Sequence, residues 1–460
     1  MFGIDRSVQN VVGSGDYGFY IALFNFSLIL NILLDFGITN YNNKNIAQNN
    51  QLLNKHLSNV IALKFLLAIF YTIVCLVIAV IIKYDFRQIQ MLLFLIANQF
   101  LLSFILYLRS NLSGLHMFKT DSLISVLDRL LMIIICSVLL WGHVTSTPFK
   151  IEWFVYSQTI AYVTTALITL LIVLKKAGLL KLNFDWHFFI VFLKQSYPFA
   201  LLIFLMAFYN RIDSVMLERM LPNGAEEAGI YAQSYRILDA ASMIAFLFAG
   251  LLLPIFSKML KHKDPVDQLV QFSYRLIIVP AVIFVIGAII YKEELIQLLY
   301  HGSKLSYSAQ IFSVIIPGLI AMSTTYIYGT LLTANGSFRQ LNIMAATAMV
   351  LNIILNIILI PKFHAFGSAI ASLTTQSLTA LVQILIANKV FGFKTNYNFL
   401  LFLLIFIVGI SGIGILFKNT FENWFLGFVL IGITGIIAAF ALKLIDLKGM
   451  FQIIKNRSED

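Results

Sequence analysis

Long apolar segments follow one another along nearly the whole chain, and no other feature of the sequence limits the fold so strongly. Each run of about 18 to 25 apolar residues is long enough to cross the ~30 Å hydrocarbon core of a bilayer as an α-helix. Of the 460 residues, 60% are hydrophobic and 12% are charged, whereas a soluble domain carries about 25% charged residues. The sequence therefore predicts an all-α polytopic membrane protein without a soluble domain.

The apolar segments are separated by short polar connections, the longest of which covers 175–195. We predict 13 membrane-spanning helices from them. Their expected ranges are 17–38, 57–82, 88–108, 121–141, 151–174, 196–217, 226–255, 271–291, 309–333, 338–360, 365–389, 397–417 and 424–446.

Basic residues are distributed unevenly between the two sets of loops that these spans create. Of the 32 Lys and Arg residues, 18 lie in one set of loops, 9 lie in the other and 5 lie within spans. Because cytoplasmic loops are enriched in Lys and Arg, the first set and the C-terminus are predicted to be cytoplasmic. The same enrichment explains the net charge of +11, so nucleic acid is not an expected partner.

The sequence contains no pattern that requires a metal ion or another cofactor. Cys75 and Cys136 lie in apolar runs without metal-ligand spacing, and we interpret both as packing residues. A Gly-rich loop with the Lys of an ATP-binding site is also absent from the sequence, so we do not expect the chain to hydrolyse ATP.

Weak sequence matches recur in the same order in the two halves of the chain. Residues 18–20 align with residues 229–231 at an offset of 211, and the same offset places Lys64 over Arg275. Internal repeats of this kind are common in transporters, so we predict two pseudo-symmetric helical bundles. The helix that starts near Ser196 has its counterpart in the first half only before Met1, and we therefore expect the first helix to be largely missing from this sequence.

Three stretches of the sequence resemble those of a known family of membrane proteins. They are GDYGFY at 15–20 with LDFGI at 34–38, SYPF at 196–199 with YNRIDSVML at 209–217, and AGIYAQSYRI at 228–237. In these stretches and in the order of its helices, the chain resembles the polysaccharide (oligosaccharide-lipid) flippases of the multidrug/oligosaccharidyl-lipid/polysaccharide exporter superfamily.

The resemblance implies two six-helix bundles followed by two extra helices. We accordingly expect an N-terminal bundle at 1–174, a cytoplasmic linker at 175–195, a C-terminal bundle at 196–389, and the two extra helices with a cytoplasmic tail at 390–460. It also implies a multi-pass protein of the bacterial inner membrane. Such a protein moves a polyprenyl-diphosphate-linked oligosaccharide across the membrane by alternating access, for surface polysaccharide biosynthesis. The implied partners are the lipid-linked anionic glycan, membrane lipids, and the polysaccharide polymerase and glycosyltransferases of the same pathway.

Ionisable residues within the spans are the candidate site residues, because each is costly in hydrocarbon. The basic candidates are Lys64, Arg129, Arg211, Arg236 and Arg275, and the acidic residues are Asp35, Asp128, Asp213 and Asp239. The small excess of cations favours an anionic guest. Polar side chains of the same spans, Asn210 and Gln233 among them, are expected either to line the path of the sugars or to join helices by hydrogen bonds.

Arg236 and Arg211 are the leading candidates for binding the substrate diphosphate in a central cavity. Arg236 shares a helix face with Asp239, so a structural ion pair is the alternative. Lys64 and Arg275 are expected at the cytoplasmic entrance, although each of them alone can also be explained by snorkelling. Arg129 has either a structural partner or a ligand role, and we expect Asp35, Asp128 and Asp239 to be candidates for coupling to a cation.

Two other functions remain open from the sequence. A membrane polysaccharide polymerase or ligase typically has a long outer loop with Arg and His, whereas the loop at 292–308 is short and contains only His301. A cation-coupled drug exporter of the same superfamily needs carboxylates deep in the first bundle, whereas Asp35 and Asp128 lie nearer the cytoplasmic side.

The membrane orientation predicted from the basic residues can be tested by cysteine labelling. Single cysteines at Lys455 and Glu226, introduced after replacement of the two native cysteines, are expected to react with a membrane-impermeant thiol reagent from opposite sides of the membrane. Labelling in intact cells and in permeabilised cells measures this. Labelling of both positions from the same side would contradict the predicted orientation.

Overall fold

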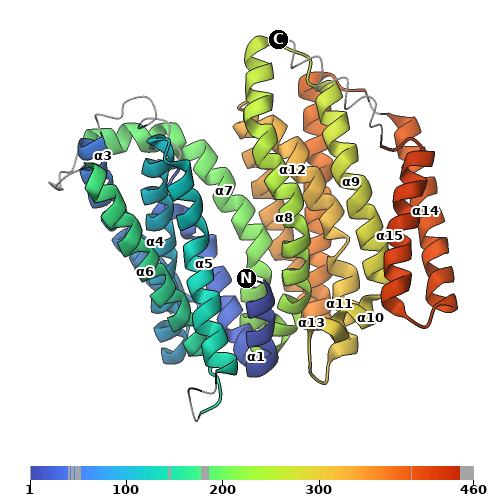
Figure 1. Cartoon of the computed structure of the whole chain (residues 1–460), viewed down its shortest axis with the longest axis horizontal. Coiled ribbons are helices and arrows are strands. Elements are labelled where there is room, and N and C mark those ends of the chain that lie inside the picture. Colours follow the sequence, from blue (N-terminus) through green and yellow to red (C-terminus); the bar gives the residue numbers. More distant parts are fainter. Residues whose placement is uncertain are drawn as a thin grey trace. The chain divides into compact units, whose positions relative to one another are not determined.

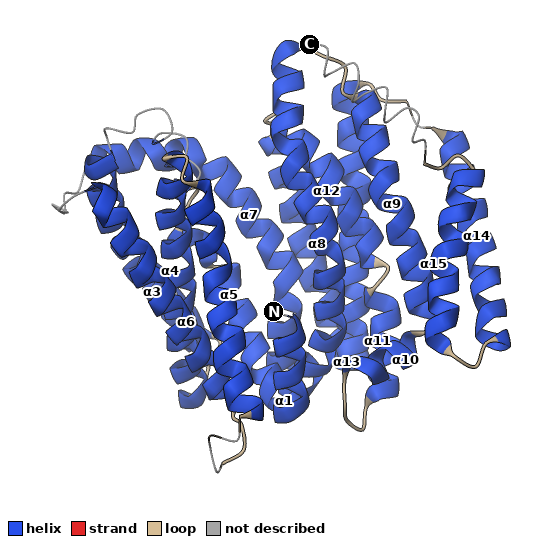
Figure 2. Cartoon of the chain, in the orientation of Figure 1, coloured by secondary structure: helices blue, strands red, loops and turns tan. Residues whose placement is uncertain are grey.

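In the computed structural model, the described part of the chain consists of α-helices joined by short connections (Figures 1 and 2). The structure describes residues 2–39, 42, 46, 53–142, 144, 147–177, 186–394 and 396–445. Every regular element among these residues is helical. A helix satisfies its backbone hydrogen bonds internally, which hydrocarbon requires because it offers no water. The prediction of an all-α polytopic protein is therefore confirmed.

The chain divides into two compact units, Met1–Gly229 and Ile230–Asp460. The elements of the first unit are α1 (Phe2–Ile29), the 3₁₀ turn η1 (Asn31–Leu34), α3 (Leu53–Ile81), α4 (Phe86–Gly114), α5 (Phe118–Trp141), α6 (Ile151–Ala177) and α7 (Trp186–Met220). Helix α8 (Gly224–His262) begins in the first unit and continues into the second. The other elements of the second unit are α9 (Asp267–Ile290), α10 (Lys292–Leu299), α11 (Leu305–Ile315), α12 (Gly318–Ala334), α13 (Phe338–Phe391), α14 (Tyr397–Thr420) and α15 (Trp424–Ala441). The bundle boundaries expected from the sequence remain predictions.

By length and composition, 11 helices of the described chain can cross a membrane. Together they cover every predicted span except the first. The spans predicted at 338–360 and 365–389 both lie in α13, where the backbone of His364 is non-helical with φ 53° and ψ −135°. The span predicted at 309–333 is interrupted at Pro317, which separates α11 from α12.

The first helix begins and ends earlier than the predicted range 17–38. Helix α1 starts at Phe2 and is interrupted only at Gly13, whose φ of 83° breaks the helical backbone. Two polar side chains of its early part, Asp5 and Gln9, are buried, and Gln9 donates a hydrogen bond to the Gly229 carbonyl oxygen at 2.8 Å. At the other end, Phe36 and Gly37 have positive φ and terminate the helical segment.

Helix α3 shows how one face of a helix is buried in the protein while another is exposed. On α3, Ile69, Ile73, Val77 and Val80 are exposed and lie three to four residues apart, so they form one apolar stripe. Hydrocarbon chains can cover such a stripe at no cost, whereas water cannot. The buried face of the same helix carries Tyr71 and Cys75, which are completely inaccessible.

Helix α1 and the start of α8 approach each other at two glycines. A Cβ atom on Gly18 would lie 1.7 Å from the Ala225 carbonyl oxygen, and a Cβ atom on Gly229 would lie 1.9 Å from the Ser14 carbonyl oxygen. The contacts are reciprocal, because the offset of 211 found in the sequence relates Gly18 to Gly229 and Ser14 to Ala225. The two helices therefore touch backbone to backbone, as small residues spaced by four allow in membranes.

This crossing predicts opposite effects for two neighbouring glycines. Gly18→Ala is expected to lower the thermal stability of the purified protein, because the added Cβ collides with backbone that cannot move aside. Gly15→Ala is the matched control, because a Cβ at Gly15 meets no atom within 4 Å. The control is expected to be neutral or to stabilise by up to about 1 kcal/mol through helix propensity. Equal melting temperatures for Gly18→Ala and wild type would contradict the close crossing.

Candidate functional site

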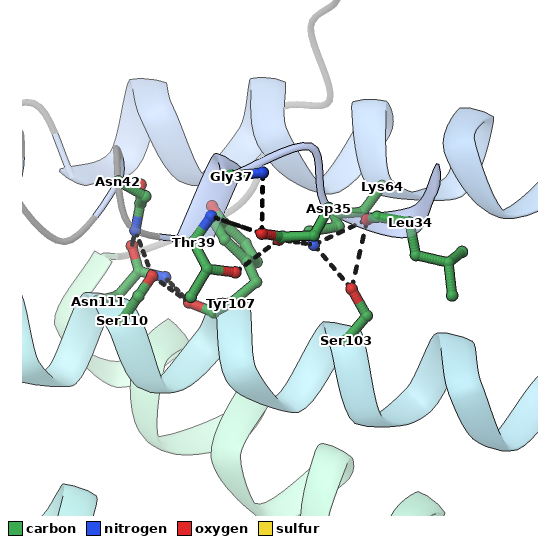
Figure 3. A network of polar contacts seen from close by, with 10 residues as sticks. All are labelled: Leu34, Asp35, Gly37, Thr39, Asn42, Lys64, Ser103, Tyr107, Ser110 and Asn111. Carbon is green, nitrogen blue, oxygen red and sulfur yellow. Dashed lines mark hydrogen bonds and ion pairs between the residues drawn. The ribbon is translucent and has the colours of Figure 1, made fainter. Parts of the chain in front are cut away.

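Lys64 and Asp35 form a buried ion pair inside the first unit (Figure 3). The Lys64 Nζ atom lies 2.5 Å from Asp35 Oδ1, and it also donates to the Leu34 carbonyl oxygen and to Ser103 Oγ, both at 2.9 Å. The Lys64 side chain is completely buried, whereas that of Asp35 is 24% exposed. An ammonium group has three N–H donors, and all three are used here.

The sequence after α1 explains why the carboxylate of Asp35 lies where Lys64 can reach it. Asp35 follows η1, and its carboxylate accepts hydrogen bonds from the backbone N–H groups of Gly37 and Thr39 at 3.2 and 3.3 Å. It also accepts one from Thr39 Oγ1 at 2.6 Å. Phe36 and Gly37 have positive φ, so the backbone here is not helical and these N–H groups have no carbonyl acceptor from a preceding helical turn. The Asp35 side chain therefore replaces the missing backbone acceptors and is fixed in orientation.

Helix α4 carries a row of polar side chains along the face next to this pair. Gln99, Ser103, Tyr107 and Ser110 are spaced by three or four residues and are largely buried. Gln99 Oε1 accepts a hydrogen bond from Asn31 Nδ2 at 2.5 Å, and Ser103 binds Lys64 as described. The Lys64 Nζ atom also lies 6.0 Å from the centre of the Tyr107 ring.

A second group of hydrogen bonds extends this row. Asn42 Nδ2 donates to Ser110 Oγ at 2.8 Å and to Asn111 Oδ1 at 3.0 Å (Figure 3). The sequence analysis did not select Asn42, Ser103, Tyr107, Ser110 or Asn111. The four of these residues that lie on α4 share a signal, the helical spacing of polar residues in a largely apolar helix, which indicates a face directed at other polar groups, whereas Asn42 has no such signal.

Most of the other candidates of the first unit lie apart from this pair in the described structure. Arg129 of α5 is exposed, and its neighbour Asp128 is buried. On α7, Arg211 is half-buried and Asp213 is buried. The Asn210 side chain donates a hydrogen bond to the Met206 carbonyl oxygen of its own helix at 2.9 Å.

The candidates of the second unit lie on α8 and α9. Arg236 and Asp239 are both half-buried on α8. Gln233, one turn before Arg236, is buried, and its Oε1 atom accepts a hydrogen bond from Ser308 Oγ of α11 at 2.6 Å. Gln233 therefore joins two helices. The Arg275 guanidinium on α9 lies 4.8 Å from the centre of the Phe399 ring and lines a cavity.

Comparison with known proteins identifies the family. A family model described as "Polysaccharide biosynthesis protein" matches residues 7–260, more than half of the chain. The chain belongs to this family. No curated protein matches the sequence.

Solved structures with the same fold are flippases and transporters. "Lipid II flippase MurJ, inward closed conformation" has a TM-score of 0.73 and 17% identity, and the match covers 95% of both chains. An inward-facing multidrug resistance MATE family transporter of the MOP superfamily has a TM-score of 0.65 and 12% identity over 85% of this chain and 94% of its own. An outward-facing MATE family transporter has a TM-score of 0.59 and 14% identity over 85% of this chain and 93% of its own. The expected fold is confirmed.

The geometry limits what the Lys64 ammonium group can do. With all three donors bound to Asp35, Leu34 and Ser103, Lys64 presents no donor to a guest in this conformation. The pair instead joins the turn after η1 to α3 and α4. A role for Lys64 in diphosphate binding remains a prediction, and it requires the ion pair to open.

Removing one member of this pair is expected to destabilise the protein strongly. Lys64→Met leaves the largely buried Asp35 carboxylate without its cation, and breaking a buried pair in this way typically costs about 3–5 kcal/mol. The partial exposure of Asp35 places the expected loss near the lower end of that range. The melting temperature of detergent-purified protein measures it.

The double variant and an exposed lysine provide the controls. Adding Asp35→Asn to Lys64→Met removes the unpaired charge, so part of the lost stability is expected to return. Lys119→Met replaces an exposed lysine at the start of α5 and is expected to have no effect. Wild-type stability of Lys64→Met would show that the ion pair does not stabilise the fold.

Proposed function

We propose that this protein is a flippase that moves a polyprenyl-diphosphate-linked oligosaccharide across the bacterial inner membrane by alternating access. The single observation that supports this most directly is the family match over residues 7–260, because that family is described by polysaccharide biosynthesis. The substrate would be used for a surface polysaccharide. The proposal therefore includes the glycosyltransferases and the polymerase of that pathway as partners, and a cytoplasmic C-terminus.

The structural likenesses support a lipid-linked cargo over a drug. The match to the lipid II flippase covers 95% of this chain, so it includes most of the segment 390–460. The match to the MATE family transporter covers only 85% of this chain at a lower TM-score. The similar structures include both inward-facing and outward-facing conformations, and this supports alternating access as the mechanism. A cation-coupled drug exporter remains the alternative, and the experiment must distinguish it from a flippase.

The cargo sets a physical requirement that the candidate residues address. A diphosphate and a sugar chain must cross the hydrocarbon core while remaining solvated, so the path needs polar and cationic side chains. Arg236 and Arg211, both half-buried on long helices, are the proposed diphosphate-binding residues. Arginine suits this role because its planar guanidinium binds phosphate oxygens in pairs. Asp239, Asp128 and Asp35 are proposed as coupling residues, and Arg129, Lys64, Arg275, Asn210 and Gln233 as further residues of the path.

Loss of the gene tests the function directly. Cells without the protein are expected to accumulate the lipid-linked oligosaccharide on the cytoplasmic side of the inner membrane and to lose the corresponding surface polysaccharide. Extraction of lipid-linked glycans and staining of surface polysaccharide measure these two effects. Unchanged glycan together with increased drug sensitivity would favour the exporter instead.

The role of Arg236 is tested by neutralising it. A charge-assisted hydrogen bond typically contributes about 1.5–3 kcal/mol, so Arg236→Gln is expected to weaken binding of the lipid-linked sugar by ~10-fold or more. Arg236→Lys should recover only part of the binding because the planar fork is lost. Binding to purified protein and export in cells are both measured, together with the amount of protein in the membrane.

The competing structural role of Arg236 gives a different pattern. If Arg236 and Asp239 only stabilise the fold as a pair, Arg236→Gln lowers the amount of folded protein. Adding Asp239→Asn would then restore abundance and export together. Normal export by Arg236→Gln at normal abundance would remove Arg236 from the site.

A further inference from the structure

A cavity of about 620 Å³ lies in the second unit, where α8 and α13 end and α9 begins. Helix α8 is terminated by Lys263, whose φ of 61° is left-handed, and the Asp264 N–H then donates to the Met259 carbonyl oxygen at 2.9 Å. Pro265 follows and cannot continue the helix. Helix α13 is terminated in a similar way by Gly392, whose φ is 69°. Residues of both helix ends line the cavity.

Apolar side chains form the inner lining of the cavity. Leu260, Val266, Phe391 and Phe393 contribute to it. The Phe391 and Phe393 rings stack with their centres 5.4 Å apart and their planes at 18°. All four side chains pack in a hydrophobic cluster of the second unit. The core therefore supports this lining and fixes the two loops that carry the polar groups.

Two cations and two carboxylates complete the lining: Lys263, Lys394, Asp264 and Asp267. Three of these side chains are exposed, and that of Asp267 is half-buried. Within the part of the chain that the structure describes, none of the four side chains has an ion-pair or hydrogen-bond partner. Their charged groups are therefore available to a guest that carries charges of both signs.

The helix ends around the cavity also present both signs of charge. The C-termini of α8 and α13 lie at the negative ends of their helix dipoles, which favour cations, whereas the N-terminus of α9 is the positive end of its dipole, which favours anions. Neither a simple anion nor a simple cation matches this combination. A zwitterion whose two charges are joined by a short link matches it.

The position of the cavity indicates where such a zwitterion comes from. The cavity lies at the ends of membrane-spanning helices, the level at which lipid headgroups meet the hydrocarbon core. Helix α14 begins three residues after Lys394, and its residues Leu400, Leu401 and Leu404 are exposed. Acyl chains of a lipid can cover these apolar side chains while its headgroup enters the cavity.

We propose that this cavity binds the headgroup of an ethanolamine phospholipid from the surrounding bilayer. Lys263 and Lys394 bind the phosphate oxygens, and Asp264 and Asp267 accept hydrogen bonds from the primary ammonium, which has three N–H donors. Phosphatidylglycerol offers no cation to the two carboxylates, and the quaternary ammonium of phosphatidylcholine has no N–H to donate. The volume is within the ~300–1,000 Å³ typical of small-molecule sites. No residue of the proposed transport path lines this cavity, so the site goes beyond the proposed function.

The test measures which phospholipid the purified protein retains. Full-length protein is purified in micelles with equal amounts of phosphatidylethanolamine, phosphatidylglycerol and phosphatidylcholine, and retained lipid is quantified by native mass spectrometry. Wild type is expected to retain phosphatidylethanolamine in preference to both others. Lys263→Gln with Lys394→Gln is expected to lower its retention by ~5-fold, which corresponds to about 1 kcal/mol, the upper value for an exposed ion pair. Lys258→Gln with Lys389→Gln is the matched control, because these lysines are exposed near the ends of α8 and α13 but do not line the cavity.

The two aspartates give a second signature that a general change of surface charge does not produce. Asp264→Asn with Asp267→Asn removes the acceptors for the ammonium and also the charges that repel an anionic headgroup. This variant is therefore expected to retain less phosphatidylethanolamine and more phosphatidylglycerol than wild type. A rise in phosphatidylglycerol without a fall in phosphatidylethanolamine would overturn the proposal.

Four further outcomes would also overturn it. Wild-type retention of phosphatidylethanolamine by the cavity lysine variant would remove the cavity as the binding site. An equal loss in the control variant would reduce the effect to general surface charge. Equal retention of phosphatidylcholine by wild type would show that the ammonium is not recognised by its N–H groups. Displacement of the lipid by millimolar glycerophosphoethanolamine would show that the site takes a free headgroup instead of a lipid. The readout is lipid retention and not transport, so failure here leaves the proposed flippase function unaffected.

Discussion

The hydrocarbon core offers no hydrogen bonds, and this constraint explains why polar side chains of different helices pair with one another. Asn25 donates to Ser214, Gln158 donates to the Tyr20 hydroxyl, and Asn31 donates to Gln99. Each of these bonds joins two elements that are distant in sequence. Because the alternative for each side chain is an unsatisfied group in hydrocarbon, a polar residue within a span stabilises one particular helix arrangement. The Lys64–Asp35 pair is the strongest case, since it joins three elements at once.

Close packing supplies the other part of the stability, because lipid chains are as apolar as the helices and the hydrophobic effect does not drive one helix against another. Backbones must therefore approach closely enough for dispersion contacts to accumulate. At the crossing of α1 and α8, Gly18 and Gly229 permit this, and Ser14 and Ala225 are the small residues four positions before them. The reciprocal contacts explain why these residues recur at the same offset in both halves of the sequence. A larger side chain at either glycine would separate both pairs.

Hydropathy was sufficient to predict the helices, because length and apolarity decide which segments cross the membrane. The ends of α1 could not be predicted this way. Its early residues are polar, yet Gln9 and Asp5 are buried in protein. The end of this helical segment is set by the Asp35 carboxylate, which accepts hydrogen bonds from the Gly37 and Thr39 N–H groups. Hydropathy does not detect such local hydrogen bonds. The sequence identified Lys64 and Asp35 as separate candidates, but only the three-dimensional structure shows that they are each other's partners.

Lys64 and Arg275 occupy equivalent positions in the two halves of the sequence but have different surroundings. They align at the offset of 211 residues, which also relates Gly18 to Gly229. The groups that contact the positive charge differ between the two positions. Lys64 meets a carboxylate, a carbonyl and a hydroxyl, and three acceptors match the three donors of a compact ammonium. Arg275 meets an aromatic ring at the edge of a cavity. A guanidinium is planar and more weakly hydrated than an ammonium, so it stacks favourably on such a ring. The lysine position is therefore a buried ion pair that joins three elements in this conformation, whereas the arginine position lies beside an aromatic ring at a cavity, and the amino acid at each position is the one whose chemistry fits those surroundings.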